Sequence, residues 1–155
     1  MVDDDDEDVS ARLNAEERGA AVHEAGHAVV AHAFKVTIKA VYIALGGGGM
    51  DTGGEQIDIT ENLAICIAGG KAEQIFNAST HSKSAKCGDF RTVRRLLLHK
   101  DLAQSERRRI HAEGHRLAEQ KLRDIAEVVQ RLAGALFAHH RIEGEKLAGL
   151  LQNAI

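Results

Sequence analysis

The chain contains no proline, and aromatic residues make up only 3% of it. Proline interrupts helices and aromatic side chains are enriched in strands, so this composition favours helices. Alanine, leucine, glutamate and arginine, all strong helix formers, are frequent throughout. A length of 155 residues is enough for one domain with a sizeable core. The sequence therefore predicts a single, mainly α-helical domain.

Acidic residues occupy every position from Asp3 to Asp8. The net charge of the chain is −3, whereas the 20 basic residues and the 17 acidic residues outside this run leave +3. Such a run predicts a disordered, solvated tail, which we place at residues 1–13, ahead of a folded domain at residues 14–155. The mild charge of that domain gives no support to a nucleic-acid partner.

Two cysteines, Cys66 and Cys87, are too few for a disulfide framework and fit a reducing compartment. The N-terminus is acidic where a signal peptide needs a basic stretch followed by an apolar one. No apolar run approaches the roughly 20 residues of a membrane helix. From these features we expect a cytoplasmic protein with no membrane partner.

Caps, β-branched residues and glycines divide the domain into elements. Asn14 to Glu17 form a capping-box pattern, which predicts a helix over residues 15–34. Residues 36–43 are rich in β-branched side chains and predict a strand, and the turn Gly46 to Gly49 with a return strand over 49–52 would complete a small hairpin. The other expected elements are helices over 60–76, 88–100, 105–139 and 143–152, a loop over 77–86, and a helix break near Arg123 and Asp124.

His23 and His27 are four residues apart in the first predicted helix, in the pattern His-Glu-x-x-His. This spacing puts both imidazoles on one helix face, where two neutral rings can hold one Zn²⁺. Glu24 points to the side of the pair, from where it can reach a water on the metal and act as general base. A catalytic zinc also needs a third protein ligand and one open position.

The residues around the motif indicate that this helix is buried. Residues 20–31 are apolar almost all round the helix. Buried histidines and glutamate need partners, and a metal supplies them. Gly26 costs about 1 kcal/mol relative to alanine, so we expect another segment to approach it closely. Two interpretations without a metal stay open: a pair of surface histidines, and a scaffold whose histidines are satisfied core groups.

The segment from Ala21 to Ala31 resembles the active-site helix of the FtsH-type ATP-dependent zinc metalloproteases. The resemblance covers roughly residues 15–152 and implies a helical metallopeptidase domain with a small β-hairpin after its active-site helix. Four more segments are similar to the family in the same order: Lys35–Ile38 to its first strand, Ile67–Ile75 to its small-residue helix with an Ala-Glu pair, Cys87–Val93 to its Asp-bearing helix start, and Arg141–Leu147 to its Gly-Glu-Glu-Leu segment.

The resemblance also implies a third zinc ligand. The family uses an aspartate at the start of a later helix, and Asp89 is the matching position. Aspartate is favoured in the first turn of a helix, and a carboxylate completes a His₂-carboxylate zinc set. Glu73 is the rival ligand, although the matching glutamate of the family is expected to support a histidine instead. The remaining interpretation is that Asp89 is an ordinary residue at the start of a helix and binds no metal.

Some family features are missing or reduced. The chain has no Gly-Lys-Ser/Thr phosphate loop of an ATP-driven motor, the stretch after the Asp89 helix is short, and the hairpin is reduced to a glycine-rich turn. We therefore expect a zinc-dependent endopeptidase for peptides or unfolded segments, which it would hold by strand addition at the hairpin. The alternative is a catalytically weak or inactive metal-binding or adaptor domain. Because the family forms rings, self-association into a homo-oligomer is also expected.

A second histidine pair, His111 and His115, has the same spacing, but Ala112 stands where the glutamate would be. Neighbouring arginines disfavour a cation there, so we interpret this pair as a solvated helix face. Cys87 lies two residues before Asp89, and a small packing residue is its default interpretation.

Overall fold

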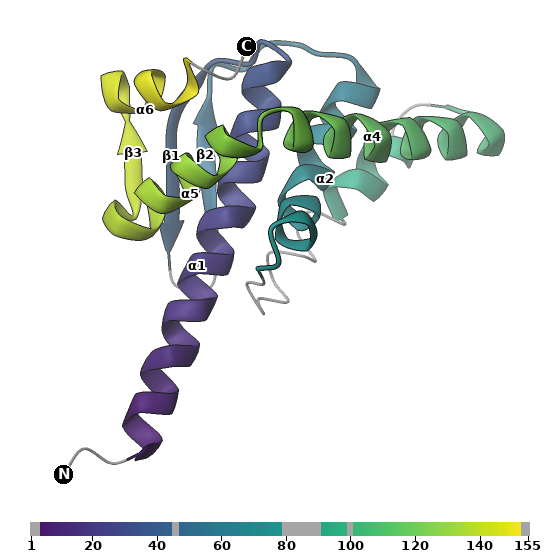
Figure 1. The fold of residues 1–155 in the computed structure, drawn as a ribbon. Helices are drawn as coiled ribbons and strands as arrows, with labels where there is room; N and C mark the ends of the chain where they lie inside the picture. The colour runs from purple at the N-terminus through teal and green to yellow at the C-terminus, as the bar shows by residue number, and fades with distance from the viewer. Residues whose placement is uncertain (1–3, 45–46, 79–90, 99–100, 153–155) are drawn as a thin grey trace.

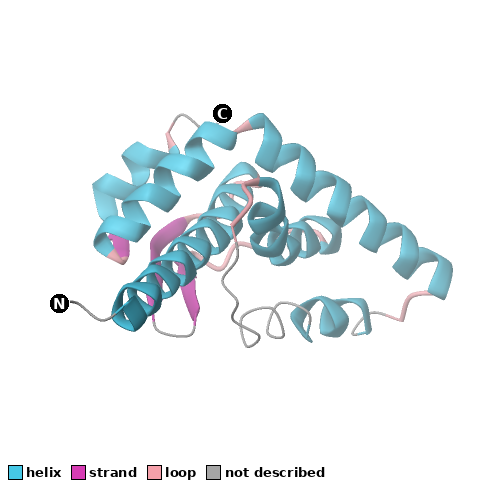
Figure 2. Cartoon of the chain, turned by 60° about the horizontal axis from the view of Figure 1, so that its bottom comes forward, coloured by secondary structure: helices cyan, strands magenta, loops and turns pink. Residues whose placement is uncertain are grey.

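The computed structural model describes residues 4–44, 47–78, 91–98 and 101–152. Within these ranges the molecule is mainly helical with a small antiparallel sheet, which confirms the predicted mainly α class. Residues 91–98 form a helical segment (Figure 2), and its Val93 packs with Leu63 and Ile110. In chain order the other elements are α1 (Asp4–Ala33), β1 (Ile38–Ala44), β2 (Gly47–Thr52), α2 (Ile59–Ile75), α4 (Gln104–Asp124), α5 (Ala126–His139), β3 (Arg141–Glu143) and α6 (Gly144–Leu151), as Figure 1 shows.

The second half of α1 forms the centre of the core. Every residue from 21 to 31 is buried, as the apolar composition of this stretch predicts. The sheet and α6 lie on one side of α1, and α2 and α4 lie on the other (Figure 1). A helix that is covered all round is held in a fixed position, so it is a suitable support for a site.

The first half of α1 differs from the prediction. The helix begins at Asp4 rather than at Ala15, so residues 4–13 of the expected disordered tail are helical. Residues 11–18 are all exposed, and this end of α1 projects from the body (Figure 1). Two effects favour the longer helix: acidic residues in the first turns interact well with the helix dipole, and the buried half supplies the nucleus from which the helix extends.

The sheet has the strand order β2-β1-β3, and both pairs are antiparallel. β1 and β2 form the hairpin expected after the first helix, and the return strand is longer than predicted because Gly47 and Gly48 belong to it. β3 was not predicted. Its buried Ile142 stands between the exposed Arg141 and Glu143, an alternation too short to be recognised in a sequence.

The helices after the sheet agree well with the prediction. The Asp58 carboxylate accepts a hydrogen bond of 2.9 Å from the backbone N–H of Glu61 and caps α2, which begins one residue before the predicted start. The long helical stretch breaks at Ile125, beside the predicted position. None of the helices in the described ranges combines the length and apolar character that crossing a membrane requires. The fully buried leucines of these helices include Leu63, Leu122, Leu132 and Leu136.

Candidate metal centre

His23, Glu24 and His27 lie in the buried half of α1, where this helix packs on α2. They are 2%, 6% and 8% exposed, respectively, so the interpretation of a surface histidine pair is wrong. The two helices approach closely because Gly26 has no side chain: a Cβ there would lie 2.8 Å from the carbonyl oxygen of Ala68 on α2. This confirms the expectation that another segment packs against Gly26.

Each histidine has its Nδ1 atom next to an acceptor. Nδ1 of His23 lies 2.8 Å from the Glu73 carboxylate, and Nδ1 of His27 lies 2.6 Å from the carbonyl oxygen of Ile65. A carboxylate and a backbone carbonyl only accept hydrogen bonds, so both Nδ1 atoms carry the proton and donate it. In the neutral rings, both Nε2 atoms therefore have the lone pair that can bind a metal.

The two Nε2 atoms face each other beside Gly69 of α2. They lie 3.0 Å apart, and the two rings are nearly perpendicular, with an interplanar angle of 80°. A Cβ on Gly69 would lie 2.5 Å from Nε2 of His27 and 2.6 Å from Nε2 of His23. Any side chain at Gly69 would thus occupy the space at the two nitrogen atoms, and glycine keeps that space open.

Glu24 lies under the hairpin. A Cβ on Gly48 of β2 would lie 2.8 Å from Cγ and 3.1 Å from Cδ of Glu24. Gly48 therefore allows the strand to pack closely over this carboxylate-bearing side chain. Because β2 is an outer strand of the sheet, Glu24 is next to a sheet edge.

The donor atoms at this site fit a metal that prefers imidazole ligands. Metal-binding histidines usually donate their second ring N–H to a carboxylate or a backbone carbonyl, and both histidines do so here. The Glu73 carboxylate contacts the Nδ1 side of His23, which is the place expected for a supporting residue and not for a third ligand. These nitrogen atoms suit Zn²⁺, which binds histidine at about 2.0–2.1 Å.

Asp89, the predicted third ligand, lies outside the described residues, as does Cys87. Within the described ranges, no group of three His, Cys, Asp or Glu side chains is arranged to hold a metal. The pair His23 and His27 therefore needs a donor from another part of the chain to complete a zinc set. Asp89 stays the predicted donor.

The second histidine pair lies on α4. The rings of His111 and His115 are 4.6 Å apart, with His111 exposed. Burial, the charge of His111 and then that of Lys71 lower the pKa of His115 below its usual value. No third metal-binding side chain joins this pair among the described residues.

Three contributors to the site were missed in the sequence: the carbonyl oxygen of Ile65, Gly69 and Gly48. A backbone carbonyl has no residue-specific signal, so no sequence pattern could identify Ile65. Gly69 is one of two adjacent glycines inside a helix, where glycine is unfavourable, and that cost was the available signal.

A scan against models of protein families and a search of curated proteins both find no match to this chain.

Proposed function

We propose that the chain is a zinc-dependent endopeptidase for peptides or unfolded segments, with His23, His27 and Asp89 as zinc ligands and Glu24 as general base. One observation carries the proposal: the two Nε2 atoms converge to 3.0 Å while each Nδ1–H is held by an acceptor. Two nitrogen ligands of a tetrahedral zinc are about 3.3 Å apart, so these rings need little movement to share an ion. A cation between two facing lone pairs also removes their mutual repulsion.

The chemistry is divided between the ion and the side chains. When bound, Zn²⁺ lowers the pKa of water and polarises a peptide carbonyl. Glu73 makes His23 a stronger donor through the hydrogen bond at Nδ1, and the carbonyl oxygen of Ile65 fixes the ring of His27. Glu24 takes the proton from the attacking water and then delivers it to the leaving amine.

The peptide would bind along β2. No described strand pairs with the outer edge of β2, so an extended segment can add to the sheet there. Gly47, Gly48 and Gly49 present no side chains that would block the added strand. Because Gly48 lies over Glu24, a peptide bond at this edge would lie next to the proposed base.

The resemblance of residues 15–152 to the protease domain of the FtsH-type zinc metalloproteases supports the same assignment, including Asp89 as a ligand. Glu24 distinguishes the two alternative functions, because holding zinc alone does not require Glu24, whereas hydrolysis does. This favours a peptidase over a metal-binding or adaptor domain. The cytoplasmic location stays a prediction.

The test compares zinc-loaded wild type with the Glu24→Gln variant on a library of fluorogenic peptides and on an unfolded protein. We expect the variant to keep its zinc and to lose cleavage by about 10²–10⁴-fold, the usual contribution of a general base. Glu16→Gln, on the exposed part of the same helix, is the matched control and should cleave like wild type. Equal activity of Glu24→Gln would remove the proposed base, and a zinc-loaded wild type that cleaves nothing would favour the adaptor alternative.

A further inference from the structure

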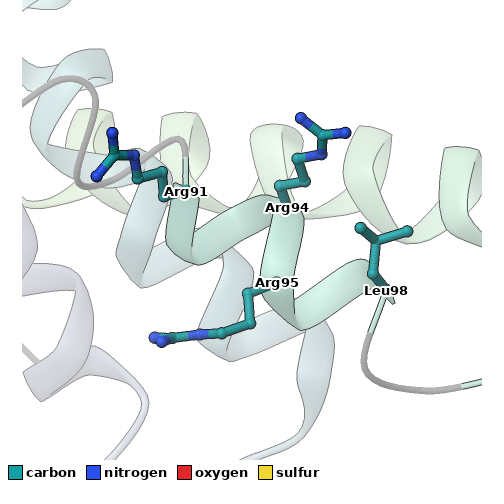
Figure 3. A pocket seen from close by; sticks show the side chains of 4 residues that line it. All are labelled: Arg91, Arg94, Arg95 and Leu98. Atoms are coloured by element: carbon teal, nitrogen blue, oxygen red, sulfur yellow. The ribbon is translucent and has the colours of Figure 1, made fainter.

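A group of arginines gathers on one surface away from the metal centre. Arg91, Arg94, Arg95 and Leu98 follow helical spacing and line an exposed pocket on the segment 91–98, as Figure 3 shows. We call these four residues the arginine face. The other side of the segment is anchored by the buried Val93, which belongs to a small apolar cluster with residues of α2 and α4. The arginine face is therefore held in place on the folded body.

Among the described residues, no acidic side chain pairs with the arginines of this face. Within the described residues, none of its three guanidinium groups forms an ion pair, whereas Arg116 pairs with Glu113 and Arg123 pairs with Glu119. A concentrated charge of one sign attracts a partner of the opposite sign. Leu98 is 57% exposed, so the face also offers an apolar contact.

The projecting end of α1 has the complementary properties. Val9 and Leu13 are 53% and 52% exposed, and their spacing of four residues puts them on one helix face. In the sequence, the acidic run from Asp3 to Asp8 comes directly before them. Together with Leu98, they are the exposed large hydrophobic side chains of the described residues. Helices in proteins gain most of their stability from packing of an apolar face, so a partner that covers Val9 and Leu13 would stabilise this end of α1.

We propose that the projecting end of α1 docks on the arginine face of a second copy of this chain. The acidic run would meet the three arginines, and Val9 with Leu13 would cover Leu98. The contact joins two copies because α1 is one continuous helix up to Ala33, and its N-terminal end and the segment 91–98 lie on different sides of the molecule (Figures 1 and 2). Two helices that each present a narrow stripe of side chains can pack along those stripes.

The first experiment is sedimentation velocity on the full chain over a range of concentrations, at low and at high salt. We expect association that grows with concentration at low salt and weakens at high salt, because exposed charge pairs are screened. If the wild-type chain stays monomeric at low salt up to its solubility limit, the proposal is wrong. This holds even if the arginine face binds some other acidic molecule.

The second experiment reverses the charge of the face. The triple variant Arg91→Glu, Arg94→Glu and Arg95→Glu should lose self-association at low salt while circular dichroism shows unchanged helix content. The control variant carries Glu at three exposed arginines elsewhere, Arg116, Arg123 and Arg131, so its net charge changes by the same amount. If the triple variant of the arginine face associates as strongly as this control, the proposal is wrong.

The third experiment restores the contact between two variants. A second variant, Asp4→Lys, Asp5→Lys and Asp6→Lys, should also be monomeric by itself. Mixed with the triple glutamate variant it should associate again, because the unchanged acidic tail of the glutamate variant can then meet the unchanged arginine face of the lysine variant. Recovery in the mixture also shows that both variants are folded. If the mixture stays monomeric, the tail and the arginine face do not contact each other and the proposal is wrong.

Discussion

The carboxylate of Glu73 lies 2.8 Å from Nδ1 of His23, and both side chains are almost completely buried. This contact joins α2 to α1 at the candidate metal centre and turns the His23 ring so that its Nε2 faces His27. Burying a carboxylate costs free energy unless it is hydrogen-bonded, and the imidazole N–H provides such a bond. Glu73 is thus well placed to hold a metal ligand in position.

Replacing Glu73 with glutamine should weaken zinc binding by about 10–100-fold, the usual effect of losing a supporting carboxylate. Glutamine keeps the shape and can still accept a hydrogen bond, but it lacks the charge that makes His23 more basic. Competition with a chromophoric chelator measures the zinc Kd. Gln74→Ala, at the exposed neighbouring position, is the control and should leave the Kd unchanged. An unchanged Kd in Glu73→Gln would show that Glu73 does not support the metal.

Asp89→Ala should reduce zinc affinity far more than Glu73→Ala. The reason is that a ligand contributes its own bond to the metal, whereas a supporting residue acts through His23. The same chelator competition compares the two alanine variants side by side. The opposite order of affinities would exchange the two roles and make Glu73 the ligand.

Gly69→Ala should block the metal centre without unfolding the domain. The new methyl group would lie 2.5 Å from Nε2 of His27, so the two rings have to move apart or the metal position is filled. We expect loss of stoichiometric zinc and a circular dichroism spectrum like that of wild type. Gly70→Ala is the matched control, because a Cβ there meets nothing within 4 Å. Normal zinc content in Gly69→Ala would mean that the metal does not bind at these two nitrogens.

Gly26→Ala tests the close packing of α1 on α2. Alanine is the better helix former by about 1 kcal/mol, but here its methyl group would press on the carbonyl oxygen of Ala68. We expect a net loss of about 1–3 kcal/mol in the free energy of unfolding, the typical cost of overpacking. Gly134→Ala in α5, where a Cβ meets nothing within 4 Å, should instead be neutral or stabilising. Urea titrations measure both, and a stabilised Gly26→Ala variant would contradict the close approach.

Much of the region around the site was predictable because its signals are local. The apolar residues around His23 and His27 indicated a buried helix, and the unfavourable Gly26 indicated a close neighbour. The helix predicted over residues 60–76 starts within one residue of α2, where the Asp58 side chain caps it. In each case the residue type itself carries the physical cause, so one sequence was enough.

Other features depend on contacts between distant segments and were not predictable. The carbonyl oxygen of Ile65 acts through the backbone, and the role of Gly69 appears only when α2 is packed on α1. β3 is a strand because residues 141–143 pair with β1, and three residues are too few for a pattern. The capping-box pattern at Asn14 predicts that α1 starts at Ala15, whereas the buried half of the same helix extends it to Asp4.

The most direct test of the zinc site is the metal content of the purified full chain after growth with zinc, measured by inductively coupled plasma mass spectrometry. A site built on His23 and His27 predicts roughly one zinc per chain, and substitution of both histidines by alanine should remove it. Less than about half an equivalent of zinc in the wild-type chain would contradict the metal centre and, with it, the proposed peptidase.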